Sequence, residues 1–442
     1  MTDKEQNDPL QAPTLSRRDF VARTVAAAGG MAAVAMGGAA ALGGCASAKE
    51  PKAEDMVLKA VEDEDIVTLD VASEQVLEAA AFEEVPFAEH VRLEATWDLP
   101  SGSLVHQVDA TAALALLPGG EGESLRKLGM LDLGTGAATT MVEGPVNKGR
   151  NVVIYDARAS KDVLIWVELD LGDFRWWVYV AQLGGQGAAQ VALGEARLVG
   201  ENSADYEPPM LAVAGDKAYW TVMPLATGPA NQEDSFLRAL AFSPTGSLQG
   251  EDGVRPGEPY TVLTSHGRML TNPLVTEGVV TFVPRVDTAN IYYQLTALNC
   301  ADDRSVDFRV LPQSLRVSHA LYVGGAFSFC IEDNYDYAGG ISRFGTYQEL
   351  ADGRYLHVSR QPLCPVVRLG DWLIVKSTVN IVGFDSAQQR YFVVDAPPQC
   401  PDFGEVLVGC GTQERFVTSS QRLAEDDNHV EATVVRVFGP AA

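Results

Sequence analysis

A glycine-centred repeat of 46 residues constrains this chain more than any other feature of its sequence. Three segments place an apolar run, a glycine turn and a second apolar run in the same order: NPLVTEGVVTFV (272–283), SHALYVGGAFSF (318–329) and CPVVRLGDWLIV (364–375). Their glycines, Gly278, Gly324 and Gly370, follow one another at intervals of 46 residues. A fixed period of this length indicates a repeat architecture, in which each unit buries its apolar face against its neighbours.

The repeated unit is built from strands. From about Val91 onward, short runs rich in Val, Leu, Tyr, Phe and Trp alternate with Gly, Pro, Asn and Asp, which predicts many short strands and an all-β fold. Four strand-like runs per unit are typical of a β-propeller blade. We expect seven blades, with six and one irregular insertion as the alternative, at these positions: 100–145, 150–201, 207–265, 268–312, 314–359, 362–397 and 400–438.

The last of these units lacks an outermost strand. The segment VRLEATWDL (91–99) is available to supply it, and an N-terminal strand in this place would close the ring and remove an open sheet edge. Upstream, LRKLGMLDLGTGAATTMVEG (125–144) resembles the outer two strands of TolB-like and quinoprotein-like propeller blades, with Asp132 and the following GTG as the hairpin turn. This resemblance implies a fold and no particular activity.

The N-terminus has the features of an export signal. Arg17 and Arg18 precede an uncharged run of mostly Ala and Gly. The segment SRRDFVA (16–22) resembles a twin-arginine translocation signal, and LGGC (42–45) resembles a bacterial lipobox with Cys45 as the lipidated residue. The resemblance implies export across the cytoplasmic membrane and a lipid anchor on the outer face of the cell envelope. A transmembrane anchor is the alternative.

These observations divide the chain into three parts. Residues 1–44 are the predicted signal peptide, residues 45–90 an acidic tether, and residues 91–442 the propeller domain. The tether is charged and poor in aromatic residues, which is typical of a flexible segment. Within it, SEQVLEAAAFEEV (73–85) is rich in helix formers and could form a short helix.

Composition and motifs narrow the function. The chain has 33 Lys and Arg against 59 Asp and Glu, a net charge of −26, which argues against a nucleic-acid partner. It contains no G-x-S-x-G elbow, Walker loop, H-E-x-x-H helix or EF-hand loop, so we assign no catalytic residue and no metal site. The regular Trp and Gly docking motifs of quinoprotein propellers are also missing from the sequence, and we predict no cofactor.

One segment concentrates acids and tyrosines. EDNYDYAGG (332–340) should lie between the second and third strands of the fifth blade, on the face of the ring that binds ligands in many propellers. Tyr combines an apolar face with a polar tip, and carboxylates accept hydrogen bonds from sugar hydroxyls. A solvated turn explains the same residues. The candidate ligand contacts are Asp333, Asn334, Tyr335, Asp336 and Tyr337, with Asn272 and His319 at nearby blade entries.

Five cysteines remain when Cys45 is set aside, and an odd number cannot all pair within one chain. Cys364 and Cys400 both precede Pro at the entry to a first strand, in adjacent blades. Since an exported protein meets conditions that permit disulfides, we predict a Cys364–Cys400 bond, with buried free thiols as the alternative.

Two classes of function fit these features. The first is a lipid-anchored binding or scaffolding module that recognises an unidentified envelope protein, peptide or glycan. The alternative is an extracytoplasmic enzyme, a glycan-active hydrolase or lyase with its site at the mouth of the channel, which would need convergent titratable side chains there. A purely structural role in an envelope complex is a third option.

Overall fold

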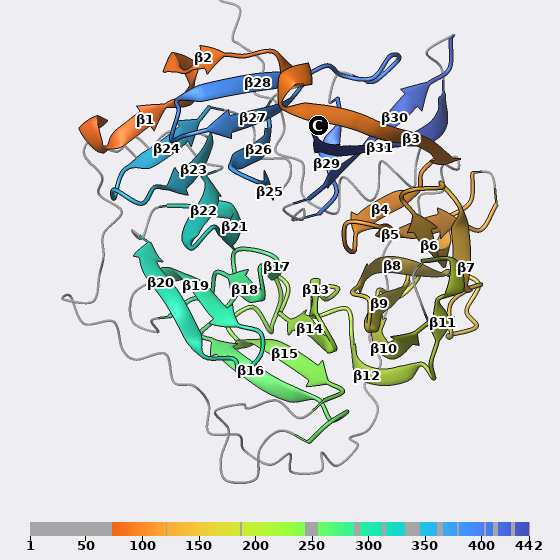
Figure 1. Cartoon of the computed structure of the whole chain (residues 1–442). Coiled ribbons are helices and arrows are strands. Elements are labelled where there is room, and N and C mark those ends of the chain that lie inside the picture. Colours follow the sequence, from red (N-terminus) through yellow and green to blue (C-terminus); the bar gives the residue numbers. More distant parts are fainter. Residues whose placement is uncertain are drawn as a thin grey trace, which may run out of the picture.

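The chain forms a seven-bladed β-propeller, which confirms the predicted all-β repeat fold (Figure 1). In a computed structural model, seven sheets of four or five strands follow one another around a ring. Among the described residues no helix is long and apolar enough to span a bilayer. The described residues are 73–120, 122–185, 188–243, 255–286, 292–311, 315–331, 345–359, 366–377, 380–401, 404–409, 414–425 and 429–441.

Blades 1 to 4 come first along the chain. Blade 1 contains β4 (Leu104–Gln107), β5 (Ala112–Pro118), β6 (Leu125–Asp132) and β7 (Ala138–Val142). Blade 2 contains β8 (Val152–Ala159), β9 (Val163–Asp170) and β10 (Trp176–Gly184), with β11 (Ala192–Leu193) and β12 (Arg197–Asn202) both against β10; a 3-10 turn, η4 (Ala188–Gln190), precedes β11. Blade 3 contains β13 (Leu211–Ala214), β14 (Lys217–Val222), β15 (Ser235–Ala241) and β16 (Tyr260–Ser265). Blade 4 contains β17 (Leu274–Thr276), β18 (Val279–Phe282), β19 (Tyr293–Asn299) and β20 (Ser305–Leu311).

The remaining blades each include a strand from the N-terminal part of the chain. Blade 5 contains β21 (Val317–Val323), β22 (Ala326–Ile331), β23 (Gly345–Glu349), β24 (Tyr355–Val358) and the added β1 (Val76–Glu78). Blade 6 contains β25 (Val367–Leu369), β26 (Trp372–Lys376), β27 (Ile381–Asp385), β28 (Arg390–Val394) and the added β2 (Glu83–Glu84). Blade 7 contains β29 (Val406–Leu407), β30 (Phe416–Leu423), β31 (Val430–Pro440) and β3 (Val91–Pro100).

The repeated glycines lie in the turn between the first and second strands of a blade. Gly278, Gly324 and Gly370 have φ values of 77°, 64° and 56°, in the left-handed region that Gly enters without strain. In blade 4, Glu277 also has a positive φ of 52°, so both central residues of that turn match the requirement of a type I′ hairpin. The 46-residue period is therefore the spacing of one tight turn from blade to blade.

The hairpin predicted at Asp132 is present between β6 and β7. The carboxylate Oδ1 of Asp132 accepts hydrogen bonds from the backbone N–H groups of Gly134 and Thr135, both at 2.9 Å. Gly136, with a φ of 75°, completes the turn. The predicted turn residues are confirmed.

The core is divided into seven apolar layers, one between each pair of neighbouring blades. Leu114 and Trp166, for example, lie in the layer between blades 1 and 2, and Phe392 and Phe438 in the layer between blades 6 and 7. Each sheet is therefore covered on both faces, as the continuous apolar run of β9 requires. The other layers follow in ring order.

Strand β3 closes the ring. It pairs antiparallel with β31 over its whole length, from Val91 opposite Pro440 to Pro100 opposite Ala432. The prediction that the 91–99 segment supplies the missing outer strand of the last unit is confirmed. Because β3 and β31 come from opposite ends of the folded domain, blade 7 joins them.

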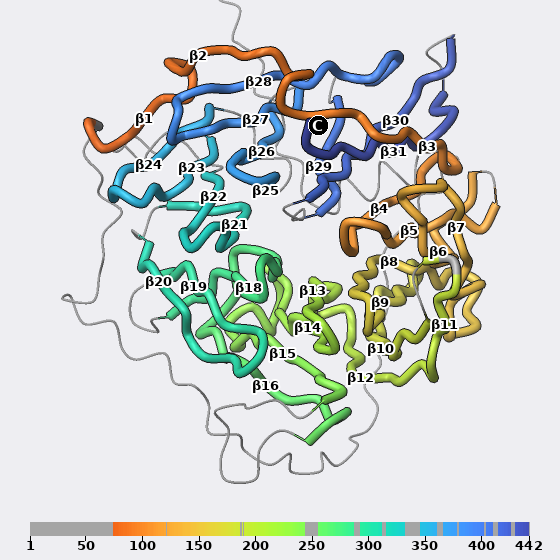
Figure 2. Tube along the Cα trace, viewed as in Figure 1, coloured from red at the N-terminus to blue at the C-terminus, as the bar shows by residue number. Residues whose placement is uncertain are grey.

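Residues 73–90 lie along the outer rim of the propeller (Figures 1 and 2). They contain β1, β2 and three single 3-10 turns, η1 (Ser73–Gln75), η2 (Ala79–Ala81) and η3 (Phe87–Glu89), instead of the helix expected over 73–85. Strands β1 and β2 pair in parallel with β24 and β28, so this segment crosses blades 5 and 6 before β3 joins blade 7. We call residues 73–90 the belt. Arg17, Arg18 and Cys45 lie outside the described residues.

Candidate functional site

The two faces of the ring carry different connections. The chain enters the first strand of each blade on one face, where the second and third strands are also joined, and we call it the entry face. The opposite face, the hairpin face, carries the turns between first and second strands and between third and fourth strands. This follows from the antiparallel order of the four strands in each blade.

The sequence-predicted ligand residues are only partly covered by the structure. Asn272 lies just before β17 and His319 lies in β21, both half-buried and both on the entry side of their blades. His319 Nδ1 is 3.2 Å from the hydroxyl of Ser318. Asp333, Asn334, Tyr335, Asp336 and Tyr337 lie outside the described residues, so their role as ligand contacts stays a prediction.

The cysteine prediction also remains untested. Cys364 lies outside the described residues, and Cys400 is half-buried. Burial, together with the nearby Glu405 carboxylate, raises the pKa of the Cys400 thiol. The predicted Cys364–Cys400 bond stays a prediction.

A basic hollow opens on the entry face where blades 1 and 2 meet. It has a volume of about 450 Å³ and is formed by the start of β6 and by the loop that joins β7 to β8. Its charged lining residues are Arg126, Lys148, Arg150 and Glu143, three cations against one carboxylate. In a chain with a net charge of −26, this local excess of positive charge is against the trend of the whole molecule.

The loop that forms the hollow is held by a buried carboxylate. Glu168 in β9 has no exposed surface, and its oxygens accept hydrogen bonds from the N–H groups of Val146 at 2.6 Å and Asn147 at 2.9 Å. The Asn147 amide and the Trp166 indole donate to the same carboxylate at 2.9 and 3.1 Å. Four donors compensate the buried charge, so the loop has a fixed shape before any ligand arrives.

Two of the cations lack acidic partners. Within the described stretches of the chain, neither Arg126 nor Arg150 makes an ion pair, and Lys148 donates to the carbonyl of Pro145 at 3.1 Å. Glu123 lies beside Arg126, since both side chains approach Gly119, but it forms no ion pair with it. The two guanidinium groups therefore keep their donors for water or for a ligand.

Several acidic groups elsewhere on the entry face have partners. Around blade 3, Arg268 lies 3.3 Å from Glu207, and His266 lies 3.7 Å from Asp234. The phenol of Tyr206 donates to Glu233 at 2.5 Å, and this hydrogen bond, with partial burial, raises the pKa of Tyr206 to about 12.

His106 lies in β4, the inner strand of blade 1, next to the inner strand β8 of blade 2. Arg158 Nη1 is 2.9 Å from His106 Nε2 and 2.5 Å from Asp156 Oδ1. A guanidinium can only donate, so His106 Nε2 is the acceptor in this contact. Arg158 thus contacts both His106 and Asp156, the two side chains that a general-base mechanism at this place would use.

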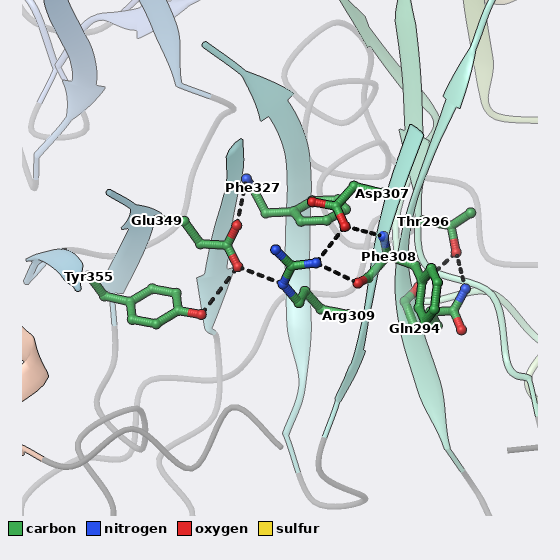
Figure 3. A network of polar contacts seen from close by, with 8 residues as sticks. All are labelled: Gln294, Thr296, Asp307, Phe308, Arg309, Phe327, Glu349 and Tyr355. Carbon is green, nitrogen blue, oxygen red and sulfur yellow. Dashed lines mark hydrogen bonds and ion pairs between the residues drawn. The ribbon is translucent and has the colours of Figure 1, made fainter. Parts of the chain in front are cut away.

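Other charged networks tie blades together on the rim. Figure 3 shows Arg309 of β20 reaching from blade 4 to Glu349 of blade 5, with Nε 3.1 Å from the carboxylate, while its Nη1 lies 2.5 Å from Asp307. The phenol of Tyr355 and the N–H of Phe327 donate to the same Glu349 carboxylate. Burial and the Glu349 charge raise the pKa of Tyr355. These contacts stabilise the interface between blades 4 and 5.

No grouping of three or more His, Cys, Asp and Glu that could hold a metal ion occurs among the residues that the structure describes. The basic hollow was not predicted from the sequence. Its signal was available in the turn GPVNKGRN (144–151), where two cations flank Gly149 in an acidic chain. Arg126 comes from a separate strand, and only the packing of blade 1 against blade 2 brings it to that turn.

The comparisons with known proteins concern only the fold. No protein-family model matches the chain, and no curated protein matches it. Among solved structures, a puromycin-hydrolysing peptidase of Mycobacterium tuberculosis is 11% identical, with a TM-score of 0.38 over 73% of this chain and 50% of that one. This chain thus spans half of that peptidase.

Two archaeal structures give similar values. The β-propeller domain of the Trilobed protease from Pyrococcus furiosus is 8% identical, with a TM-score of 0.30 over 65% of this chain and 72% of that one. The acylaminoacyl peptidase of Pyrococcus horikoshii is 8% identical, with a TM-score of 0.35 over 62% and 43%. At sequence identities this low, the similarity is one of fold and gives no information about activity.

Proposed function

We propose that this chain is an extracytoplasmic, lipid-anchored propeller that binds a ligand through its entry face, and that the basic hollow takes an oxyanion of that ligand. The anchor would be the lipidated Cys45. The observation that carries the proposal is the hollow between blades 1 and 2, where Arg126 and Arg150 make no ion pair with any described acidic residue.

The chemistry of the hollow favours phosphate or carboxylate groups. A guanidinium is always charged, and its planar donors match the oxygens of these groups in pairs. The buried Glu168 fixes the loop, so less conformational entropy is lost when a ligand binds. An envelope peptide or an acidic glycan carries such groups, and a neutral sugar does not.

The repulsion of the remaining surface adds selectivity. With a net charge of −26, the molecule repels anions at a distance, whereas the hollow offers a local attraction. Binding should therefore require direct contact between the oxyanion and the arginines. It should weaken as salt is added, because the hollow is open to solvent.

The test is calorimetric titration of the full chain with inorganic phosphate, with glucose as a neutral probe. We expect phosphate and not glucose to bind, and each of Arg126→Gln and Arg150→Gln to weaken phosphate binding about tenfold, a change of about 1.4 kcal/mol. Lys127→Gln is the matched control, since the next residue of β6 points to the opposite face of the sheet. Unchanged phosphate binding in the double arginine variant would refute the proposal.

The enzyme alternative has its own readout. Incubating the same protein with acidic and neutral envelope polysaccharides, and measuring new reducing ends, would detect hydrolase or lyase activity. Release of reducing ends would replace the binding proposal with the enzyme alternative. Binding without release supports the proposal.

A further inference from the structure

Two exposed apolar side chains lie beside the basic hollow. Val146 is in the loop between β7 and β8 that forms the hollow, and it is 43% exposed. Phe174 is in the turn between β9 and β10, also on the entry face, and it is 49% exposed. The other large apolar residues that are exposed in the described part of the chain all lie in strands: Leu93, Leu104, Leu198, Val306 and Phe308.

The turn between β9 and β10 lies against the loop of the hollow. The N–H of Leu171 donates to the carbonyl of Asn151 at 3.1 Å. The turn is itself closed by a hydrogen bond from the N–H of Phe174 to the carbonyl of Asp170, at 2.8 Å. Because hydrogen bonds fix both loops, Val146 and Phe174 hold their places beside the hollow before any ligand arrives.

The fold does not explain the aromatic ring of Phe174. The segment DLGDFR (170–175) forms the same turn as DLGTGA (132–137) on the hairpin face, since in both the Asp carboxylate accepts the N–H of the Gly two positions later, at 2.7 and 2.9 Å. The fifth residue has a φ of 60° at Phe174 and of 75° at Gly136. Gly enters this region without strain and a bulky residue does not. An exposed aromatic residue at a strained position indicates a contact with another molecule.

The charged groups around this edge have both signs. Arg175 of the same turn adds a fourth cation to the three of the hollow. The described carboxylates of these loops and of the adjoining strand ends are Glu123, Glu143, Asp170, Asp173 and Glu201. Asp170 and Asp173 accept backbone N–H groups of their own turn, at 2.7 and 3.0 Å, whereas Glu143 lines the hollow together with the arginines. This lining suits a ligand that carries a phosphate and an ammonium group close together.

We propose that this edge of the entry face docks on a phospholipid surface that contains phosphatidylethanolamine. The headgroup phosphate would bind Arg126 and Arg150, and the headgroup ammonium would bind Glu143. Val146 and Phe174 would enter the apolar part of the lipid interface. The inference rests on the proposed oxyanion site and names the group that fills it.

Two observations favour a zwitterionic lipid surface as the occupant. A soluble ligand could fill the hollow but would leave Val146 and Phe174 in water, whereas a lipid surface removes both from water. A net charge of −26 repels a strongly anionic surface, so a headgroup without net charge is preferred.

Hydrogen exchange of the full chain in the presence of lipid vesicles, followed by mass spectrometry, tests the docking. Vesicles of phosphatidylcholine with phosphatidylethanolamine should slow the exchange of peptides covering 144–151 and 170–175 about threefold. The matched turn at 132–137, on the opposite face, should not change. Phosphatidylglycerol in place of phosphatidylethanolamine should raise the lipid concentration for half-maximal protection about tenfold. Because this readout is local, vesicle binding by another part of the chain does not produce it.

Phe174→Gly is the most informative variant. It should leave stability in urea unchanged or increased, because Gly suits the φ of 60°, and should raise the lipid concentration for half-maximal protection about tenfold. Val146→Ser should weaken docking in the same way. Leu93→Ser is the control, since it removes an equally exposed apolar side chain, 43% exposed, from blade 7. Glu143→Gln should remove the preference for phosphatidylethanolamine over phosphatidylglycerol.

Three results would overturn the docking. The first is phosphate binding in the calorimetric titration without protection by vesicles, which would leave the oxyanion site in place. The second is equal protection of 170–175 by soluble glycerophosphoethanolamine, which would assign the edge to a free ligand. The third is protection of 170–175 that rises with protein concentration in the absence of lipid, which would assign the edge to a second copy of the chain. Absence of both phosphate binding and vesicle protection would refute the oxyanion site and the docking together.

Discussion

The ammonium group of Lys217 lies 3.0 and 3.1 Å from the two carboxylate oxygens of Asp303, and both side chains are buried. Lys217 begins β14 in blade 3, and Asp303 lies in the turn between β19 and β20 in blade 4. The phenol of Tyr260 donates to the same carboxylate at 2.8 Å. A single buried ion pair thus joins two hairpins of neighbouring blades.

Breaking this pair should destabilise the fold strongly. Asp303→Asn leaves the buried ammonium without its counter-charge, and we expect a loss of about 3–5 kcal/mol in the free energy of unfolding. Asn suits the positive φ of 57° at this position, so backbone strain does not contribute. Urea denaturation measures the loss. Asp302→Asn, at the half-buried neighbouring residue, is the control and should cost less than about 1 kcal/mol; equal effects of the two changes would contradict the prediction.

Tyr206 should titrate at unusually high pH. The pKa of its phenol is raised to about 12 because the hydroxyl donates to Glu233 and because the side chain is partly buried. Replacing the carboxylate with an amide, Glu233→Gln, should bring this pKa back toward 10. The tyrosinate absorbance of each protein, minus that of the same protein carrying Tyr206→Phe, isolates the residue. An identical difference curve in both backgrounds would show that Glu233 has no effect.

Tight packing inside blade 6 makes one glycine essential. A Cβ at Gly383 in β27 would lie 2.2 Å from the ring of Phe392, which is fully buried and cannot move aside. Gly383→Ala should therefore reduce the free energy of unfolding by about 1–3 kcal/mol. At Gly184 the same methyl group meets no atom within 4 Å. Gly184→Ala is the matched control, and equal stability of the two variants would contradict this packing.

Cys45 is predicted to carry the lipid. In the native host, the full chain should incorporate labelled fatty acid, and the mature protein should begin at Cys45. Cys45→Ala should abolish the labelling, and Arg17→Lys with Arg18→Lys should block export. Recovery of a membrane-bound protein that retains residues 1–44 would contradict the lipoprotein prediction and favour the transmembrane anchor.

The thiols should differ in reactivity. Burial raises the pKa of Cys300 to about 11, so the thiolate is scarce at neutral pH and alkylation of this residue should be slow. If the predicted bond is present, Cys364 and Cys400 should be alkylated together, and only after reduction. Peptide mapping without reductant distinguishes the cases. Labelling of both residues before reduction would eliminate the disulfide.

The propeller could be predicted from the sequence because its strongest restraints are local and repeat. Gly278 and its equivalents must sit in a turn that only a positive φ allows, and that turn recurs once per blade. Strand β3 could be predicted for a similar reason. The last repeat lacked an outer strand, and an open sheet edge needs a strand to cover it. Both predictions can be made without knowing which blades are in contact.

The belt and the hollow depend on contacts that the sequence does not reveal. The belt has few large apolar residues, such as Phe82 and Val85, among small and acidic ones, and strands of two or three residues show no alternation. The sequence of this segment is typical of a tether because its contacts lie far away in the chain. Glu78, for example, contacts His357, which is 279 positions further along. Arg126 and Arg150 likewise come together only when two blades pack.

The pairing of β3 with β31 also bears on how the protein is made. A ribosome synthesises β3 before any blade is complete and β31 after all the other described strands, so the ring stays open until β31 has been made. A nascent chain that stops short of residue 430 leaves the edges of β3 and β30 unpaired and open to proteases and to aggregation. The seam in blade 7 therefore forms only after the strands of the other six blades have been synthesised.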